Sequence, residues 1–149
     1  MLGALIMTLA SCGPKGNVSV PQSNQGAKTN VNECLKGCAM LTGTGMFSKE
    51  FCTGSCWVAK AKDNNDASIC EKDEVKKDGM LSMSCYLGLA ESTGDAKYCD
   101  KIGDSAQDGM RGACYGTAAK TKKDPSVCEG IKGNMMYESC KEEAAGTEE

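Results

Sequence analysis

The chain lacks histidine altogether and has few aromatic residues. Histidine is the commonest general base and a frequent metal ligand, so its absence argues against the usual catalytic triads and most transition-metal sites. Aromatic residues make up 5% of the chain and the formal net charge is −3. Because there is no basic stripe and no set of stacking rings, the sequence predicts no nucleic-acid binding. We expect no enzymatic activity and no cofactor.

Large apolar side chains are also scarce. Beyond Cys12 the sequence contains only sixteen Leu, Ile, Val and Phe residues, a share typical of chains too poor in apolar surface to fold. Fixing the backbone of each residue costs roughly 1–2 kcal/mol. A disulfide that closes a loop of about 15 residues contributes roughly 3 kcal/mol in the chain-entropy model. With eleven cysteines, the composition is typical of a small exported domain held together by disulfides.

The N-terminal residues have the features of an export signal. Residues 1–11 form an apolar run that is too short to span a bilayer and fits the apolar region of a secretion signal. The run ends in Leu9-Ala10-Ser11-Cys12, which resembles the lipobox of bacterial lipoproteins. The resemblance implies a diacylglyceryl group on the Cys12 sulfur and cleavage before Cys12. No Lys or Arg precedes the run, so either the true start lies upstream of Met1 or the signal is atypical.

The same resemblance predicts where the protein resides. Gly13 follows Cys12, and by analogy with the family this is no inner-membrane retention signal. We therefore expect a protein held by its lipid on the periplasmic or cell-surface side of a membrane. Residues 12–31, rich in Gly, Ser, Asn and Gln, are predicted to form a flexible tether. The alternative is an ordinary cleaved signal in which Cys12 is incidental.

Residues 32–145 are predicted to form a domain built from a repeat of about 29 residues, followed by a disordered tail at 146–149. Three series recur at this spacing: Cys56, Cys85 and Cys114; Cys70, Cys99 and Cys128; Asp66, Asp95 and Asp124. An aromatic residue follows the first cysteine of each unit, and an alanine lies five positions after it: Trp57, Tyr86 and Tyr115; Ala61, Ala90 and Ala119. A terminal copy begins at Cys140 with Ala145. Its polar Lys141 at the aromatic position is expected of a capping repeat.

Each unit is predicted to form two helices. Each of the repeated aspartates is expected to cap a first helix, because its carboxylate can accept the free N–H groups of the following turn. In the second helix an apolar residue lies four positions before the cysteine, and this spacing places both on one buried face: Leu81, Met110 and Met136. The sequence therefore predicts an all-α fold, a disulfide-stapled array of short helical hairpins.

Two pairing schemes fit the repeated cysteines. Pairing within units gives Cys70–Cys85, Cys99–Cys114 and Cys128–Cys140. Pairing between units gives Cys56–Cys70, Cys85–Cys99 and Cys114–Cys128, and it leaves Cys140 to find another partner. Spacing alone does not decide the connectivity. We favour the first scheme because it leaves no cysteine unpaired.

The first hairpin carries two Cys-x-x-x-Cys pairs, Cys34 with Cys38 and Cys52 with Cys56. On a helix each pair projects both sulfurs from one face. Antiparallel helices would then join Cys38 to Cys52 and Cys34 to Cys56. This spacing resembles the twin Cys-x-x-x-Cys hairpin of the small Tim chaperones of mitochondria, over residues 34–56 only. If Cys12 is acylated, the other ten cysteines form five disulfides without remainder.

Two classes of function remain open at this point. The first is a non-catalytic binding or structural module whose ligand or protein partner is unknown. The second is an envelope redox protein, chaperone or zinc protein that uses the paired motifs, with Cys34, Cys38, Cys52 and Cys56 as the alternative metal ligands. The two classes differ in whether any thiol is free under native conditions.

Overall fold

The computed structural model describes residues 28–102 and 108–146. Every regular element in these ranges is a helix: α1 (Val31–Cys38), η1 (Gly45–Phe47), α2 (Lys49–Asn64), η2 (Ala67–Glu71), α3 (Asp73–Lys76), α4 (Gly79–Thr93), η3 (Ala96–Lys101), α5 (Asp108–Lys122), η4 (Pro125–Ile131) and α6 (Tyr137–Ala145). The elements labelled η are 3₁₀-helices. The prediction of an all-α, disulfide-linked array is confirmed. The expected signal segment, Cys12, most of the expected tether and residues 147–149 lie outside the described residues.

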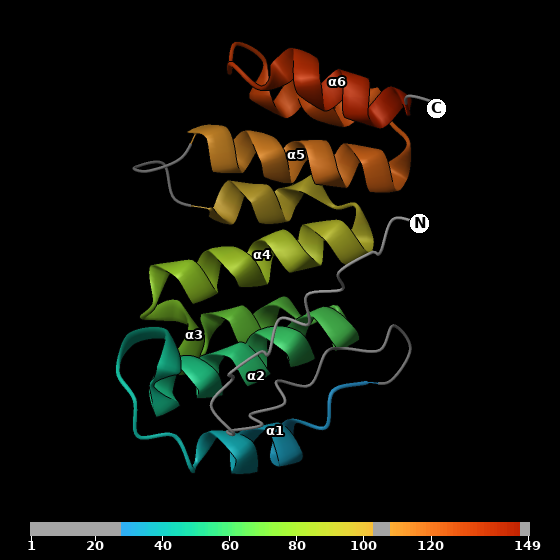
Figure 1. Cartoon of the computed structure of the whole chain (residues 1–149). Helices are drawn as coiled ribbons and strands as arrows, with labels where there is room; N and C mark the ends of the chain where they lie inside the picture. The colour runs from blue at the N-terminus through green and yellow to red at the C-terminus, as the bar shows by residue number, and fades with distance from the viewer. Residues whose placement is uncertain (1–27, 103–107, 147–149) are drawn as a thin grey trace, which may run out of the picture.

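The long helices α2, α4, α5 and α6 are stacked in one column, with α1 beside α2 at the N-terminal end (Figure 1). Each long helix runs in roughly the same direction as the next, and the 3₁₀ segment between them returns across the stack. Neighbouring long helices contact each other in sequence order. Each unit therefore buries its apolar face mainly against the units before and after it, as in other helical repeats.

The boundary between units has the same backbone geometry three times. Asn65, Gly94 and Lys123, which occupy equivalent positions of the repeat, follow α2, α4 and α5 and have φ values of +52°, +69° and +52°. This left-handed conformation ends each helix. The aspartate that comes next accepts a hydrogen bond from a backbone N–H two residues on: Asp66 from Ser68, Asp95 from Lys97 and Asp124 from Ser126. The predicted N-caps are confirmed, but each begins a 3₁₀-helix.

The core between the helices consists largely of small side chains and cystines. Ala61, Ala90 and Ala119 have no exposed surface, as their repeated positions predict. Leu89 and Val75 are the largest apolar side chains that are completely buried. Because the alanines are small, adjacent helices approach closely and bury little apolar area per residue. The sulfur atoms of the disulfides fill the space that Leu or Phe fills in larger cores.

Two sequence predictions about the buried face are wrong. Met110 is 39% exposed, whereas the equivalent Leu81 is 4% exposed. Leu81 packs over Gly54 of α2, but the position equivalent to Gly54 in the next unit holds Met83, which itself packs against the core. Met83 thus supplies the bulk that a buried Met110 would have provided. Between α5 and α6 this position is again a glycine, Gly112. A Cβ added there would lie 2.5 Å from the Cβ of Met136, which is partly buried.

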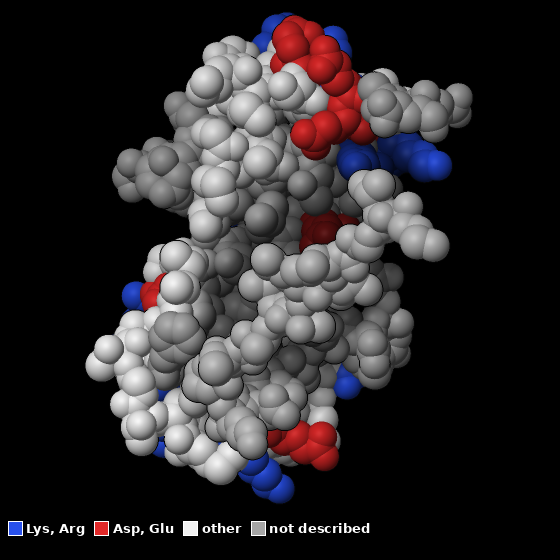
Figure 2. Space-filling model, in the orientation of Figure 1, with Lys and Arg blue, Asp and Glu red and all other residues white. Residues whose placement is uncertain are grey.

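The second error concerns the terminal copy. The sequence predicts Ala145 as its buried alanine, but Ala145 is exposed and Ala144 is 5% exposed. Ala144 corresponds to Leu89 and Ala118, which are also buried. The chain leaves the helix after Ala145, and no described unit packs beyond it. Figure 2 shows acidic side chains over α6, so this end of the column presents a polar surface.

Candidate functional site

Five disulfides join the ten described cysteines: Cys34–Cys56, Cys38–Cys52, Cys70–Cys85, Cys99–Cys114 and Cys128–Cys140. In the later units each bond ties a 3₁₀ segment to the long α-helix of the same unit (α4, α5) or to α6, with Cα–Cα distances between 5.6 and 5.9 Å. These are the within-unit pairs of the first scheme, and no between-unit pair occurs among them. Each covalent loop is therefore local to one unit.

The twin motifs place four sulfurs together between α1 and α2. The inner sulfurs of the two disulfides, Sγ of Cys38 and Sγ of Cys56, lie 3.5 Å apart. The sulfurs of Cys34, Cys38 and Cys56 lie within 4.8 Å of one another. A zinc site requires thiolates, and here all four sulfurs are bonded in disulfides. The structure therefore has the geometry of a double cross-link that fastens α1 to the column.

Five disulfides in a chain of 149 residues fit an extracellular or otherwise oxidising compartment. Among residues 28–102 and 108–146, none of the helices has the length and apolar character needed to cross a membrane.

A repeated tyrosine–carboxylate pair escaped the sequence analysis. The hydroxyl of Tyr86 donates a hydrogen bond to Glu71, and that of Tyr137 donates one to Glu129. The hydroxyl of Tyr115 donates one to Asp100 across 2.8 Å. The three carboxylates recur at the repeat spacing, and each directly follows a disulfide cysteine. That spacing was visible in the sequence, but the partner was not, because Tyr137 lies eight residues from its acid and the other tyrosines lie fifteen.

This pair gives Tyr86 an unusual titration. Burial, followed by the hydrogen bond to Glu71, raises the pKa of Tyr86 to about 12. Below pH 10 the tyrosine is neutral in both the folded and the unfolded chain, and its contribution to stability is fully present. Between pH 10 and 12 only the unfolded chain loses the proton, so this contribution declines as the pH rises.

We therefore expect the Tyr86→Phe variant to lack the tyrosine that ionises last. The difference in absorbance near 295 nm between the wild-type and variant proteins, recorded against pH, isolates the titration of Tyr86. Glu71→Gln should lower this pKa while leaving it above 10, because burial is the larger cause. A difference curve centred at the ordinary tyrosine pKa would contradict the assignment.

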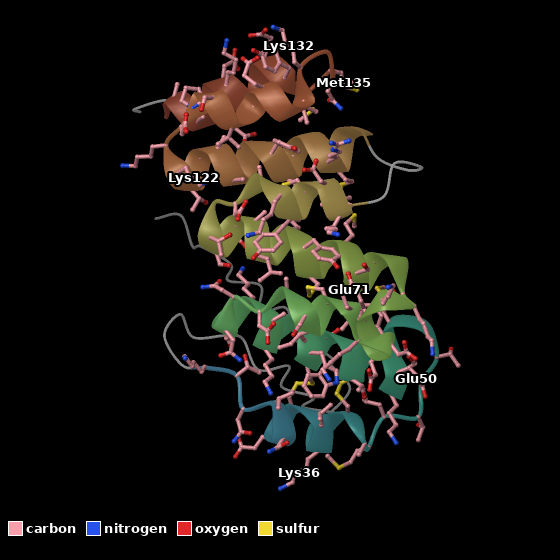
Figure 3. The ribbon with its side chains drawn as sticks, turned by 180° about the vertical axis from the view of Figure 1, so that it is seen from behind. Lys36, Glu50, Glu71, Lys122, Lys132 and Met135 are labelled. Atoms are coloured by element: carbon pink, nitrogen blue, oxygen red, sulfur yellow. A yellow bond between two sulfur atoms is a disulfide. The ribbon has the colours of Figure 1, made fainter. Side chains whose placement is uncertain are left out.

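A groove opens at the edge of the column where the long helices begin. It has a volume of about 820 Å³ and lies between η1, the first turns of α2 and α4, and α3. Its apolar lining comes from Met46, Phe51, Met80 and Leu81. Met46 and Met80 are 63% and 54% exposed, although they are large apolar side chains. Figure 3 labels Glu50 at this edge of the column and Lys122 at the opposite edge.

Carboxylates outnumber lysines around the groove. Glu50, Asp73, Glu74 and Asp78 line it together with Lys49 and Lys77. Lys77 is paired with Asp73 at 2.8 Å, and this ion pair lowers the pKa of Asp73 and raises that of Lys77. The Asp78 carboxylate accepts hydrogen bonds from the N–H groups of Met80 and Leu81 at the start of α4. Within the described residues, Glu50 and Glu74 form no ion pair.

The groove is lined by apolar side chains, with carboxylates and lysines around them. No polar or charged side chain is buried within the described part of the chain. The groove is not predictable from the sequence because its walls come from residues 45–53 and 73–81, whose proximity depends on how the units stack. The hint that was present is the pair of methionines, Met46 and Met80, outside the core positions of the repeat. Cys12, the expected lipidation site, lies outside the described residues.

Together the fold and the covalent links define a class: the chain is an all-α repeat protein whose units are each closed by a disulfide. No protein-family model matches it, and no similar protein was found among curated proteins or solved structures.

Proposed function

We propose that the chain is a membrane-anchored lipoprotein of the cell envelope, whose helical repeat domain serves as a non-catalytic binding or structural module. Two observations support this: the lipobox-like Leu9-Ala10-Ser11-Cys12 behind an apolar run and the five disulfides of the domain. A lipid on Cys12 attaches the chain to the periplasmic or cell-surface side of a membrane. The residues before α1 then serve as the tether.

The observation that carries the binding role is the groove between η1, α3 and the first turns of α2 and α4. A rigid scaffold with an exposed apolar groove is suited to recognition. The disulfides make that scaffold resistant to local opening and to proteolysis, which is useful in a compartment that contains secreted proteases. The ligand would be a protein partner met at the membrane surface.

The contact between the two disulfides of the first hairpin favours a second candidate function. Sγ of Cys38 and Sγ of Cys56 are 3.5 Å apart, close enough for thiol–disulfide exchange once one bond is opened by an external thiol. In that case the protein is an envelope redox protein or chaperone that uses Cys34, Cys38, Cys52 and Cys56. Reduced thiols at these positions would also be the ligands of the zinc alternative.

Intact-mass analysis of the protein purified from membranes separates these candidates. After alkylation without reduction, the lipoprotein module should carry no label, and after reduction it should carry ten labels. Its mass should correspond to cleavage before Cys12 plus acyl chains. Four labels without reduction, placed in the first hairpin, would instead support redox or zinc chemistry there.

The Cys12→Ser variant tests the anchor directly. We expect it to move from the membrane fraction to the soluble fraction, because the sulfur that would carry the lipid is gone. Ser11→Ala is the matched control, since it leaves Cys12 and the small-residue character of the motif intact. Both proteins are followed by fractionation and immunoblotting. Continued membrane association of Cys12→Ser would contradict the lipoprotein proposal.

A further inference from the structure

The groove has a property that the binding role leaves unspecified, namely the chemistry of its occupant. Two of the five exposed large apolar side chains in the described residues, Met46 and Met80, line this single groove. They are distant in sequence and line the same groove because η1 and α4 both pack against α2. Phe51 and Leu81 pack against the core or lie within it and form the apolar floor.

Methionine suits a recognition surface of this kind. Its unbranched, polarisable side chain adapts to differently shaped apolar groups at small cost. The volume of about 820 Å³ exceeds what one side chain fills and lies within the usual range for ligand sites. The groove can therefore accept several apolar side chains presented together.

The rim determines the sign of the partner's charge. Glu50 and Glu74 stand beside the apolar lining without an ion-pair partner within the described residues, and only Lys49 offers an unneutralised positive charge. The N-termini of the two long helices at the groove already have side-chain acceptors, since Ser48 caps α2 and Asp78 caps α4. The site therefore attracts positive charge more than it attracts anions.

The fold also restricts the partner's conformation. No strand is present among the described residues, so there is no sheet edge to which an extended peptide could add by backbone hydrogen bonds. A helix brings its own backbone hydrogen bonds and needs only side-chain contacts. An apolar groove with a charged rim accordingly fits a helix-in-groove interaction.

The chain's own N-terminal residues are a poor occupant on sequence grounds. Residues 13–27 contain two prolines, Pro14 and Pro21, and only two large apolar residues, Val18 and Val20. Proline inside a helix removes a hydrogen bond and costs roughly 3 kcal/mol. This segment lacks the pattern of an amphipathic helix and carries one lysine, Lys15.

We propose that the groove formed by Met46, Phe51, Met80 and Leu81 binds a cationic amphipathic helix of a partner protein. This inference rests on the proposed binding function and names its site and class of ligand. Apolar side chains of the helix enter the methionine-lined groove. Its Lys or Arg side chains pair with Glu50 and Glu74.

The test uses the full exported chain with Cys12→Ser, which carries no acyl group, and a synthetic 14-residue amphipathic peptide of Leu and Lys. A peptide with Glu in place of Lys is the charge control. Methyl-labelled methionines report the location of binding by NMR, and fluorescence anisotropy gives the affinity. We expect the Met46 and Met80 signals to shift with the Leu/Lys peptide while those of the distant Met135 do not, and the Leu/Glu peptide to bind at least tenfold more weakly.

Two surface variants make the result specific. Met80→Lys and Glu74→Lys should each weaken binding by about tenfold or more. Met135→Lys, also at an exposed methionine, and Glu138→Lys, also in the first turn of a helix, should leave it unchanged. All four substitutions replace exposed side chains, so unfolding is not expected, and circular dichroism verifies this.

Three outcomes of the peptide titrations would overturn the inference: no binding, equal binding to all four variants, or equal binding of both peptides. A dimer of the chain that Met80→Lys dissociates, or contacts from Met80 to residues 1–27, would show that another occupant holds the groove, and would also overturn it. None of these results bears on the lipid at Cys12, which the membrane fractionation tests. Conversely, loss of the lipoprotein assignment leaves the peptide experiment valid, because that experiment is done in solution.

Discussion

Replacing Cys99 and Cys114 together with alanine should lower the free energy of unfolding by about 3 kcal/mol. The bond closes a loop of 15 residues, and in the chain-entropy model a loop of this length is worth roughly that amount. Both side chains have no exposed surface, so lost packing makes the loop-closure value a lower limit for this effect. The measurement is equilibrium unfolding in urea followed by circular dichroism.

The single variant Cys99→Ala tests the pairing itself. It should release one thiol, that of Cys114, which alkylation after unfolding detects and which can form mixed dimers. An unchanged urea midpoint for the double variant would show that this disulfide does not contribute to the free energy of unfolding.

The second large effect is expected from one methyl group in α2. A Cβ at Gly54 would lie 2.5 Å from the carbonyl oxygen of Glu74 and would also collide with Leu81. This carbonyl oxygen is part of the backbone of α3, so it can move away only if the contact between α2 and α3 loosens. We expect Gly54→Ala to destabilise the protein by about 1–3 kcal/mol, the usual cost of overpacking.

Gly37→Ala is the matched control. Gly37 lies in α1, also between two cysteines of a Cys-x-x-x-Cys motif, and nothing lies within 4 Å of the Cβ that alanine would add. Alanine is favoured over glycine in a helix by roughly 1 kcal/mol, so this variant should be slightly more stable than the wild type. Substitutions of identical chemistry in the two motifs thus have opposite expected signs. A neutral result at Gly54 would mean that α2 and α3 are not in close contact.

Most of the fold could be predicted from the sequence, because each predicted cap, helix and disulfide recurs in three units of the repeat. Asp66 alone is one of many possible caps, but Asp66, Asp95 and Asp124 at equal spacing before a cysteine indicate a common boundary. The disulfides within units could be predicted for a similar reason. A hairpin brings Cys99 and Cys114 together whatever the arrangement of the other units. Local geometry repeated along a chain is accessible from sequence.

The size of a side chain at one position can compensate for the size of its neighbour in the adjacent unit, and the repeat spacing does not show this. Leu81 is buried because Gly54 makes room for it, and Met110 is partly exposed because Met83 fills the equivalent place. The spacing rule applied to Leu81 and Met110 alike, yet burial depended on a residue in the preceding helix. The prediction for Ala145 failed for a related reason, because no described unit packs beyond α6 to cover this position.

The groove was inaccessible to sequence reasoning for a different physical cause. Met46 and Met80 belong to no repeated position with a known environment, and the distance between them depends on how the first two units stack. The tyrosine–carboxylate pairs were only partly predictable from the sequence. Glu71, Asp100 and Glu129 recur in the sequence, and a search for further series at the repeat spacing would have found them.

Because each of the later disulfides closes within its own unit, a segment such as residues 66–94 contains both halves of a bond, Cys70 and Cys85. Duplication or loss of such a segment in a gene changes the number of units without leaving a cysteine that must exchange partners. The same locality lets each bond form as soon as its own unit is in an oxidising environment, without any cysteine of a later unit. A column built in this way can gain or lose units in evolution while its oxidative folding stays the same.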